Sequence, residues 1–170
     1  MEDLDQAIAH YLLDHIGSHG VLRTQFVKLM YLADVVSVST YGRRATTLPW
    51  IRYDHGPLAF GIYDIEKQLD ASGCARTQER MSASGKKYTV IRPTDNDAPA
   101  LPPDVQIVAN KVLADYGHLS LSELLKTAYS TKPMQRAEHG DMLNFTALVP
   151  DEPMKDEDET WLFSGLPWGE

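Results

Sequence analysis

The chain has 170 residues, a mass of 19.0 kDa and a hydrophobic fraction of 43%, which is enough to bury a core without a metal or a disulfide. Its formal charge of −8 is concentrated near one end, because residues 150–170 hold seven acids and one lysine, whereas residues 1–92 hold eleven basic and ten acidic residues. The single cysteine excludes an intramolecular disulfide, and without a signal-peptide pattern or an apolar run of roughly 18 residues we expect a cytoplasmic protein with no membrane span.

Two helices are predicted at the start of the chain. Apolar residues recur at helical spacing over residues 2–16, and Gly17 follows in the position of a C-terminal glycine. A second helix is expected to begin with Thr24 as its N-cap and to bury the stripe between Phe26 and Val36. It should fade over residues 36–40, because β-branched and serine residues are weaker helix formers.

Residues 41–64, YGRRATTLPWIRYDHGPLAFGIYD, are dense in aromatic and arginine side chains. Leu48–Tyr53 is expected to be extended, since a residue that precedes proline is driven out of the α region. Asp54–Pro57 has turn chemistry, and Pro57 suits the first position of a third helix that stops at Gly73. The apolar positions that this helix would bury are Leu58, Ile62, Ile65 and Leu69.

The second half predicts a hairpin followed by shorter helices. Residues 75–80 and 86–92 indicate two strands, and the proline-rich residues 93–103 a linker. A fourth helix should run from an Asp104 cap to Gly117, a fifth should open at the Ser120–Glu123 capping box, and a short helical turn should reach about His139. The expected fold is mainly α (α+β): one compact domain over residues 1–149, with five to six helices and one small β-hairpin, and a tail over residues 150–170.

Patterns for catalysis or metal binding are weak. The eleven glycines are scattered, so no phosphate-binding loop is predicted, and the six histidines lack zinc-ligand spacing. Cys74 is expected to pack as a small apolar group. Asp54-His55 would provide half of an acid–base pair, but an aspartate before His-Gly-Pro more often closes a turn through its carboxylate. We therefore expect no enzyme, no cofactor and no metal.

A winged-helix DNA-binding regulator is the alternative, because three helices followed by a hairpin would also describe that fold. Residues 1–92 net only +1, where a DNA-binding module usually shows a clear positive excess. The candidate phosphate contacts are Arg43, Arg44, Arg76, Arg80, Lys86 and Lys87. Nucleic acid is therefore the less favoured partner, and the alternative stays open.

An ordered set of short motifs runs through the first half of the chain. Its residues are Lys28, Leu29, Tyr31, Tyr41, Gly42, Trp50, Gly56, Pro57 and Tyr63. This set resembles the Panacea antitoxin domain, the family of SocA-like and phage-associated GepA-like proteins. There, a Lys-Leu-hydrophobic-Tyr helix precedes a Tyr-Gly, an extended aromatic segment, a Gly-Pro and a helix bearing a tyrosine. The resemblance continues in residues 116–124, YGHLSLSEL, and at Pro133, and it departs at Met134, where the family often has tryptophan.

The resemblance implies an antitoxin that binds a cognate protein toxin encoded beside it and, in the SocA-like case, delivers that toxin to an AAA+ protease. It implies no catalytic residue and leaves the oligomeric state open. We expect Tyr31 and Trp50 to lie in the core, since aromatic side chains supply large buried area. Arginine and tyrosine are frequent in binding hot spots. The expected partner-binding residues of the domain are Arg43, Arg44, Arg52, Tyr53 and His55.

The tail MKDEDETWLFSGLPWGE forms a separate candidate contact. Four consecutive acids precede spaced large apolar residues, a pattern that favours a segment folding against another surface. The tail residues expected to dock on the partner are Trp161, Leu162, Phe163 and Trp168. The alternative is that these side chains fold back onto the protein's own core.

Overall fold

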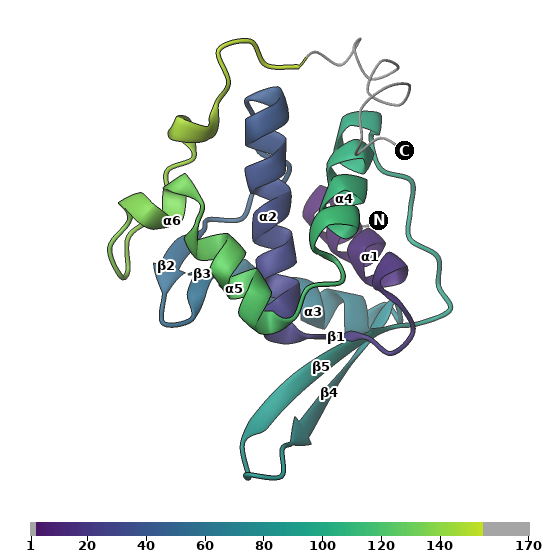
Figure 1. The fold of residues 1–170 in the computed structure, drawn as a ribbon. Coiled ribbons are helices and arrows are strands. Elements are labelled where there is room, and N and C mark those ends of the chain that lie inside the picture. Colours follow the sequence, from purple (N-terminus) through teal and green to yellow (C-terminus); the bar gives the residue numbers. More distant parts are fainter. Residues whose placement is uncertain (1–2, 155–170) are drawn as a thin grey trace.

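The computed structural model describes residues 3–154 (Figure 1). The helices are α1 (Leu4–Ile16), α2 (Arg23–Tyr41), α3 (Gly61–Ala71), α4 (Pro103–Tyr116), α5 (Leu121–Tyr129), α6 (Lys132–Arg136) and the 3₁₀ turn η1 (Thr146–Leu148). The strands are β1 (Val21–Leu22), β2 (Ile51–Tyr53), β3 (Gly56–Leu58), β4 (Ala75–Met81) and β5 (Lys87–Pro93). The expected α+β fold is confirmed. Within the described range, no helix is both long and apolar enough to cross a membrane.

Helix α2 forms the centre of the fold, with α1 and α4 on one side and α5 with the β2–β3 pair on the other (Figure 1). Every residue from Phe26 to Asp34 is buried. A helix that is apolar nearly all round has to be enclosed by other elements. The remaining helices and both sheets therefore serve as layers around α2.

The limits of α2 differ from the sequence prediction. The helix begins at Arg23 with Leu22 as its N-cap, instead of at Thr24, and it does not fade after Val36 but continues to Tyr41. Its last two turns stay helical because tertiary burial outweighs weak propensity. Gly42 then ends the helix in the left-handed region, at φ 74°, and donates its N–H to the Val38 carbonyl at 2.9 Å.

Strands β2 and β3 replace the predicted start of the third helix. Pro57 lies opposite Arg52 in this antiparallel pair, and α3 begins only at Gly61. Residues 140–143 lie along the other side of β2: the Gly140 N–H donates to the Arg52 carbonyl at 2.7 Å, and the Leu143 N–H to the Trp50 carbonyl at 2.9 Å. This pairing joins segments about ninety residues apart, so local sequence could not reveal it.

The predicted hairpin is present as β4 and β5, and it projects away from the helices (Figure 1). It belongs to a three-stranded antiparallel sheet of order β1-β5-β4. Sequence reasoning missed β1, because its two residues pair only with Val90 and Ile91 of β5. The pairing ties the base of the hairpin to the chain just before α2.

The later helices follow the prediction with small shifts. The N-cap of α4 is Pro102, and Asp104 lies in the first turn instead of at the cap. The capping box of α5 is confirmed, with the Glu123 N–H donating to Ser120 Oγ at 3.2 Å and the Ser120 N–H to Glu123 Oε2 at 3.4 Å. Helix α6 ends at Arg136, three residues before the expected His139.

Candidate partner-binding surface

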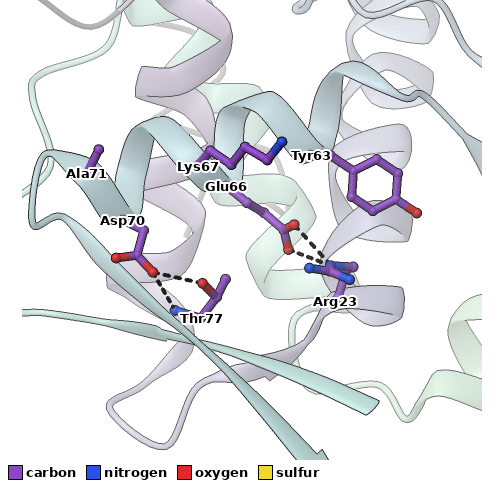
Figure 2. Close-up of a pocket in the computed structure, with 7 residues that line it drawn as sticks. All are labelled: Arg23, Tyr63, Glu66, Lys67, Asp70, Ala71 and Thr77. Atoms are coloured by element: carbon purple, nitrogen blue, oxygen red, sulfur yellow. Dashed lines mark hydrogen bonds and ion pairs between the residues drawn. The ribbon is translucent and has the colours of Figure 1, made fainter. Parts of the chain in front are cut away.

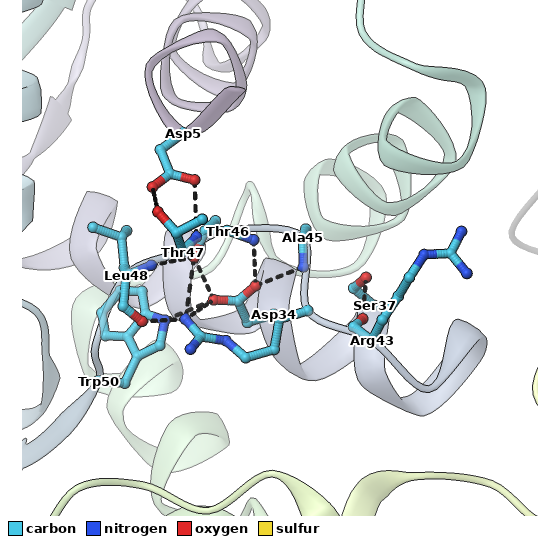
Figure 3. Close-up of polar contacts among 10 residues, drawn as sticks. Asp5, Asp34, Ser37, Arg43, Ala45, Thr46, Thr47, Leu48 and Trp50 are labelled. Carbon is cyan, nitrogen blue, oxygen red and sulfur yellow. Dashed lines mark hydrogen bonds and ion pairs between the residues drawn. The ribbon is translucent and has the colours of Figure 1, made fainter. Parts of the chain in front are cut away.

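Asp34 of α2 is fully buried, and its carboxylate holds the loop that leads to β2 (Figure 3). Its Oδ1 accepts 2.8 Å hydrogen bonds from the backbone N–H groups of Ala45 and Thr46. Its Oδ2 accepts from Thr46 Oγ1 at 2.5 Å and from Trp50 Nε1 at 2.7 Å. The guanidinium of Arg44 adds a charged donor at 2.9 Å. Donors thus surround this buried charge, and the loop is fixed by the same contacts.

A second carboxylate ties the same loop to α1. The Thr47 N–H donates to Asp5 Oδ1 at 2.9 Å, and Thr47 Oγ1 donates to Asp5 Oδ2 at 2.5 Å (Figure 3). The Arg44 guanidinium also donates to the carbonyl of Leu48. Residues 44–48 are therefore held by contacts with both helices, and they position β2 beside α2.

Arg52 of β2 is used inside the domain. Its Nη1 donates to the carbonyls of Met134 and Ala137, at 2.8 and 2.9 Å, and its guanidinium lies over the ring of Tyr129, 5.4 Å from the centroid. These carbonyls lie at the C-terminal end of α6, where a cation is favourable. Arg52 thus clamps α6 against β2 and helps to place the residues that follow α6.

We call Asp34, residues 44–48 and Arg52, with the contacts described above, the frame. Next to the frame lies a run of exposed rings, which we call the aromatic strip: Tyr53, Phe60, Tyr63 and His139. Tyr53 stacks on His139 with centroids 5.5 Å apart and meets Phe60 edge to face at 5.7 Å. Phe60 continues to Tyr63 at 6.5 Å. The exposed fractions of Tyr53, Phe60 and Tyr63 are 39%, 55% and 36%. The strip is therefore a continuous set of large rings with much of their area open to solvent, a feature that can mark an interaction site.

One end of the strip borders a pocket of about 380 Å³ between α2, α3 and β4 (Figure 2). The guanidinium of Arg23 lies over the Tyr63 ring, 5.2 Å from its centroid, and its Nε donates to both oxygens of the buried Glu66 at 2.8 and 3.0 Å. On the far side, Asp70 accepts from the hydroxyl of Thr77 at 2.8 Å. That hydrogen bond and the one from the Thr77 N–H are the main reasons why the pKa of Asp70 is lowered.

Residues 26–133, which include most of this frame and most of the strip, match the family model described as "Antitoxin SocA-like, Panacea domain". The match covers more than half of the chain. The chain belongs to this antitoxin family. Neither the curated proteins nor the solved structures gave a match.

Most of the motif residues of the Panacea domain are buried. Trp50 and Tyr31 lie in the core, as expected, with exposed fractions of 1% and 0%. The Tyr31 hydroxyl hydrogen-bonds Thr131 Oγ1 at 2.8 Å, and burial raises the pKa of Tyr31 to about 12. The other motif positions that the structure buries are Lys28, Leu29, Tyr41, Gly56 and Pro57.

The sequence-predicted contact residues of this Panacea-domain protein separate into two groups. Tyr53 and His55 are exposed, and Tyr53 lies in the aromatic strip. Arg43 is exposed but pairs with Asp104 at 2.8 Å, while Arg44 and Arg52 bind groups of this chain. Tyr53 and His55 are therefore accessible to a partner, and the contact roles of all five residues stay predictions. Trp161, Leu162, Phe163 and Trp168 lie outside the described residues.

Sequence reasoning missed Arg23, Phe60 and His139 as surface residues. The sequence places Phe60 inside a helix beginning at Pro57, whereas α3 begins only at Gly61 and the Phe60 ring is open to solvent. His139 comes from a segment that only tertiary pairing brings to Tyr53. A signal was available for Phe60 alone, as an aromatic between Ala59 and Gly61 that fits no predicted apolar stripe.

The residues that the sequence offered for metal binding or catalysis have defined places in the structure. The described residues contain no cluster of three His, Cys, Asp or Glu side chains that could hold a metal. Asp54 Oδ1 is bound to His139 Nε2 at 2.6 Å, so its carboxylate does not close the turn as predicted, and both side chains are more than 60% exposed. Cys74 is buried. A water-excluding catalytic cleft at Asp54 finds no support in this exposed pair.

Proposed function

We propose that this antitoxin-family protein neutralises a cognate protein toxin by binding it directly through the aromatic strip. The observation that carries the proposal is the unbroken contact of four exposed rings from Tyr53 to Tyr63 and His139, on a frame fixed by Asp34 and Arg52. Tyrosine and arginine are over-represented among residues that dominate binding energy, and Arg23 lies over the last ring of the strip. Such rings lose little conformational entropy on binding when their neighbours already hold them.

The area requirement is modest. A nanomolar complex needs about −12 kcal/mol, and a standard interface buries roughly 1,600 Å² in total. The strip with the adjoining pocket supplies the central anchors of such an interface, and the surrounding polar surface of α3 and the β2–β3 turn supplies the rim. Inhibition then requires only that the bound antitoxin cover the working surface of the toxin.

The test begins with a toxic reading frame next to the gene for this chain. Co-expression of the wild-type protein should relieve growth arrest, and the purified pair should form a stable complex. Phe60→Ala and Tyr63→Ala should each weaken that complex by about 30-fold or more, as expected for hot-spot aromatics. Tyr88→Ala is the matched control, because Tyr88 on the hairpin is 37% exposed, almost the same as Tyr63 at 36%. Equal losses in all three variants, or no relief of toxicity by the wild type, would refute the proposal.

Delivery of the toxin to an AAA+ protease is a separate part of the proposal, supported by the SocA-like family membership alone. It predicts that the half-life of the toxin after translation arrest is shorter in cells that contain this protein. Deletion of the protease should restore the half-life. If growth is rescued with no change in half-life, the protein works by occlusion alone.

The DNA-binding alternative rests on the hairpin, where residues 75–93 carry five basic residues and one acid. Helix α3, which would have to enter the groove, instead carries three acids and one lysine. A winged-helix protein would place that charge against phosphates, which is unfavourable. A gel shift with the gene's own promoter tests the alternative, and binding that weakens steeply with salt would support it.

We also propose that the protein acts without catalysis. Alanine substitution of both Asp54 and His55 should leave toxin neutralisation intact, since the proposed action depends on affinity and not on proton transfer. Loss of neutralisation in a double variant that still forms the complex would point to chemistry at this turn.

A further inference from the structure

Lys28 of α2 places an ammonium group inside the domain. The residue is 4% exposed, and no described residue offers it a hydrogen bond or an ion pair. Burial is the cause that lowers its pKa to about 8. The group is thus still mainly protonated at pH 7, and an unpaired buried charge is costly to maintain.

The end of the Lys28 side chain lies between the β2–β3 turn and α5. A methyl group added at Gly56 of β3 would lie 3.3 Å from Lys28 Cε, 3.4 Å from Leu125 Cδ2 and 3.9 Å from Lys28 Nζ. Nζ has no partner among the described residues but is not completely enclosed, so it keeps a narrow contact with solvent. Gly56 stands opposite Tyr53 in the β2–β3 ladder, so the amine lies beside the strand pair that carries the Tyr53 ring of the aromatic strip.

Charged groups on the surrounding elements do not neutralise this amine. Asp54, on the turn, is bound to His139, and Glu123, on α5, completes the capping box with Ser120. Glu66 is bound to Arg23 at the start of α2. The other titratable side chains of the turn, β2 and α5 are Arg52, Tyr53, His55, Lys126 and Tyr129. No described acid is therefore free to pair with Lys28 from these elements.

We propose that Lys28 is the receptor for a carboxylate that the toxin presents from an Asp or Glu side chain when it docks on the aromatic strip. The proposal rests on the proposed function. The free protein already holds the ammonium group largely desolvated, so the incoming carboxylate gains a charge-assisted hydrogen bond while only the partner's charge must leave water. A receptor fixed in this way adds specificity, because a partner without an acid at that position leaves Lys28 unpaired.

The first experiment measures toxin binding by titration calorimetry for the wild type, Lys28→Met and Lys126→Met. Met preserves the length of the side chain and removes the charge, and Lys126 is an exposed lysine on α5 that serves as the matched control. Lys28→Met should weaken binding about 30-fold or more at pH 7, whereas Lys126→Met should stay within about threefold of the wild type. Wild-type affinity should also fall as pH rises from 7 to 9.5, with proton uptake on binding at pH 8.5, and Lys28→Met should lose both effects.

The second experiment needs no toxin. The side-chain ¹⁵N and ¹³C resonances of Lys28 are followed by pH titration at increasing sodium acetate, with sodium chloride at equal ionic strength as the reference. Acetate should raise the pKa of Lys28 and leave that of Lys126 unchanged. The proposal is overturned if acetate does not affect Lys28, or if Lys28→Met binds the toxin with wild-type affinity and pH dependence. Failure of the wild type to bind any toxin would refute the proposed function, and the acetate titration would still decide whether Lys28 receives a carboxylate.

Discussion

At the scale of single residues, Asp34 shows how a buried charge organises a loop. Its carboxylate accepts from two backbone N–H groups, a hydroxyl, an indole and a guanidinium. Asp34→Asn would remove the charge that compensates Arg44 and turn a donor toward other donors. We expect it to lower the free energy of unfolding by about 3–5 kcal/mol, measured by urea denaturation. Asp54→Asn, at an exposed ion pair, is the control and should change stability by less than about 0.5 kcal/mol.

For Lys28 we expect the opposite effect: removal of its charge should stabilise the protein, whereas removal of the Asp34 charge should destabilise it. Its pKa is lower in the folded state than in the unfolded chain, so the unfolded state binds more protons between about pH 8 and 10.5, and stability rises with pH across that window. Lys28→Met should therefore stabilise the protein by roughly 1–3 kcal/mol at pH 7, and the gain should vanish near pH 10.5. Urea denaturation at several pH values checks this. A destabilised variant at pH 7 would show that the ammonium group has an internal partner.

At the scale of elements, the capping box of α5 offers a sharp test of local structure. Ser120→Ala removes the hydroxyl that accepts from the Glu123 N–H, and we expect a loss of about 1 kcal/mol in unfolding free energy. Ser122→Ala is the matched control, since Ser122 is exposed inside the same helix and alanine has the higher helix propensity. Equal destabilisation by both changes would mean that the cap does not set the start of α5.

Local signals account for the parts of the fold that sequence could predict. Apolar spacing located α1, α4 and α5, and the capping box fixed the start of α5. The end of α2 and the β2–β3 pair escaped prediction because they depend on packing and on hydrogen bonds from residues 140–143. The same cause applies at the surface: residue type could indicate Tyr53 as a candidate contact, whereas His139 reaches Tyr53 only through those non-local bonds.

At the scale of the whole molecule, the contacts of Pro153 and Met154 with the end of α2 indicate where the protein can be shortened. The Met154 N–H donates to the Thr40 carbonyl at 2.7 Å, and a methyl group at Gly42 would lie 3.2 Å from Pro153 Cγ. We expect truncation after Val149 to lower the melting temperature and truncation after Met154 to leave it unchanged. If the tail docks on the toxin, the variant truncated after Met154 should keep its thermal stability and lose toxin binding. A large loss of thermal stability after Met154 would favour the tail packing on its own domain.

The bonds between residues 140–143 and β2 have a consequence for synthesis. Tyr53, Phe60 and Tyr63 are translated early, but the stretch that carries His139 and secures Trp50 and Arg52 follows some eighty residues later. A nascent or prematurely stopped chain would present the Tyr53 ring on a strand that lacks these bonds, with Phe60 and Tyr63 at the start of α3. If the aromatic strip binds the toxin, this ability would appear only after residue 143 has been translated, and we expect a chain that stalls earlier not to neutralise the toxin.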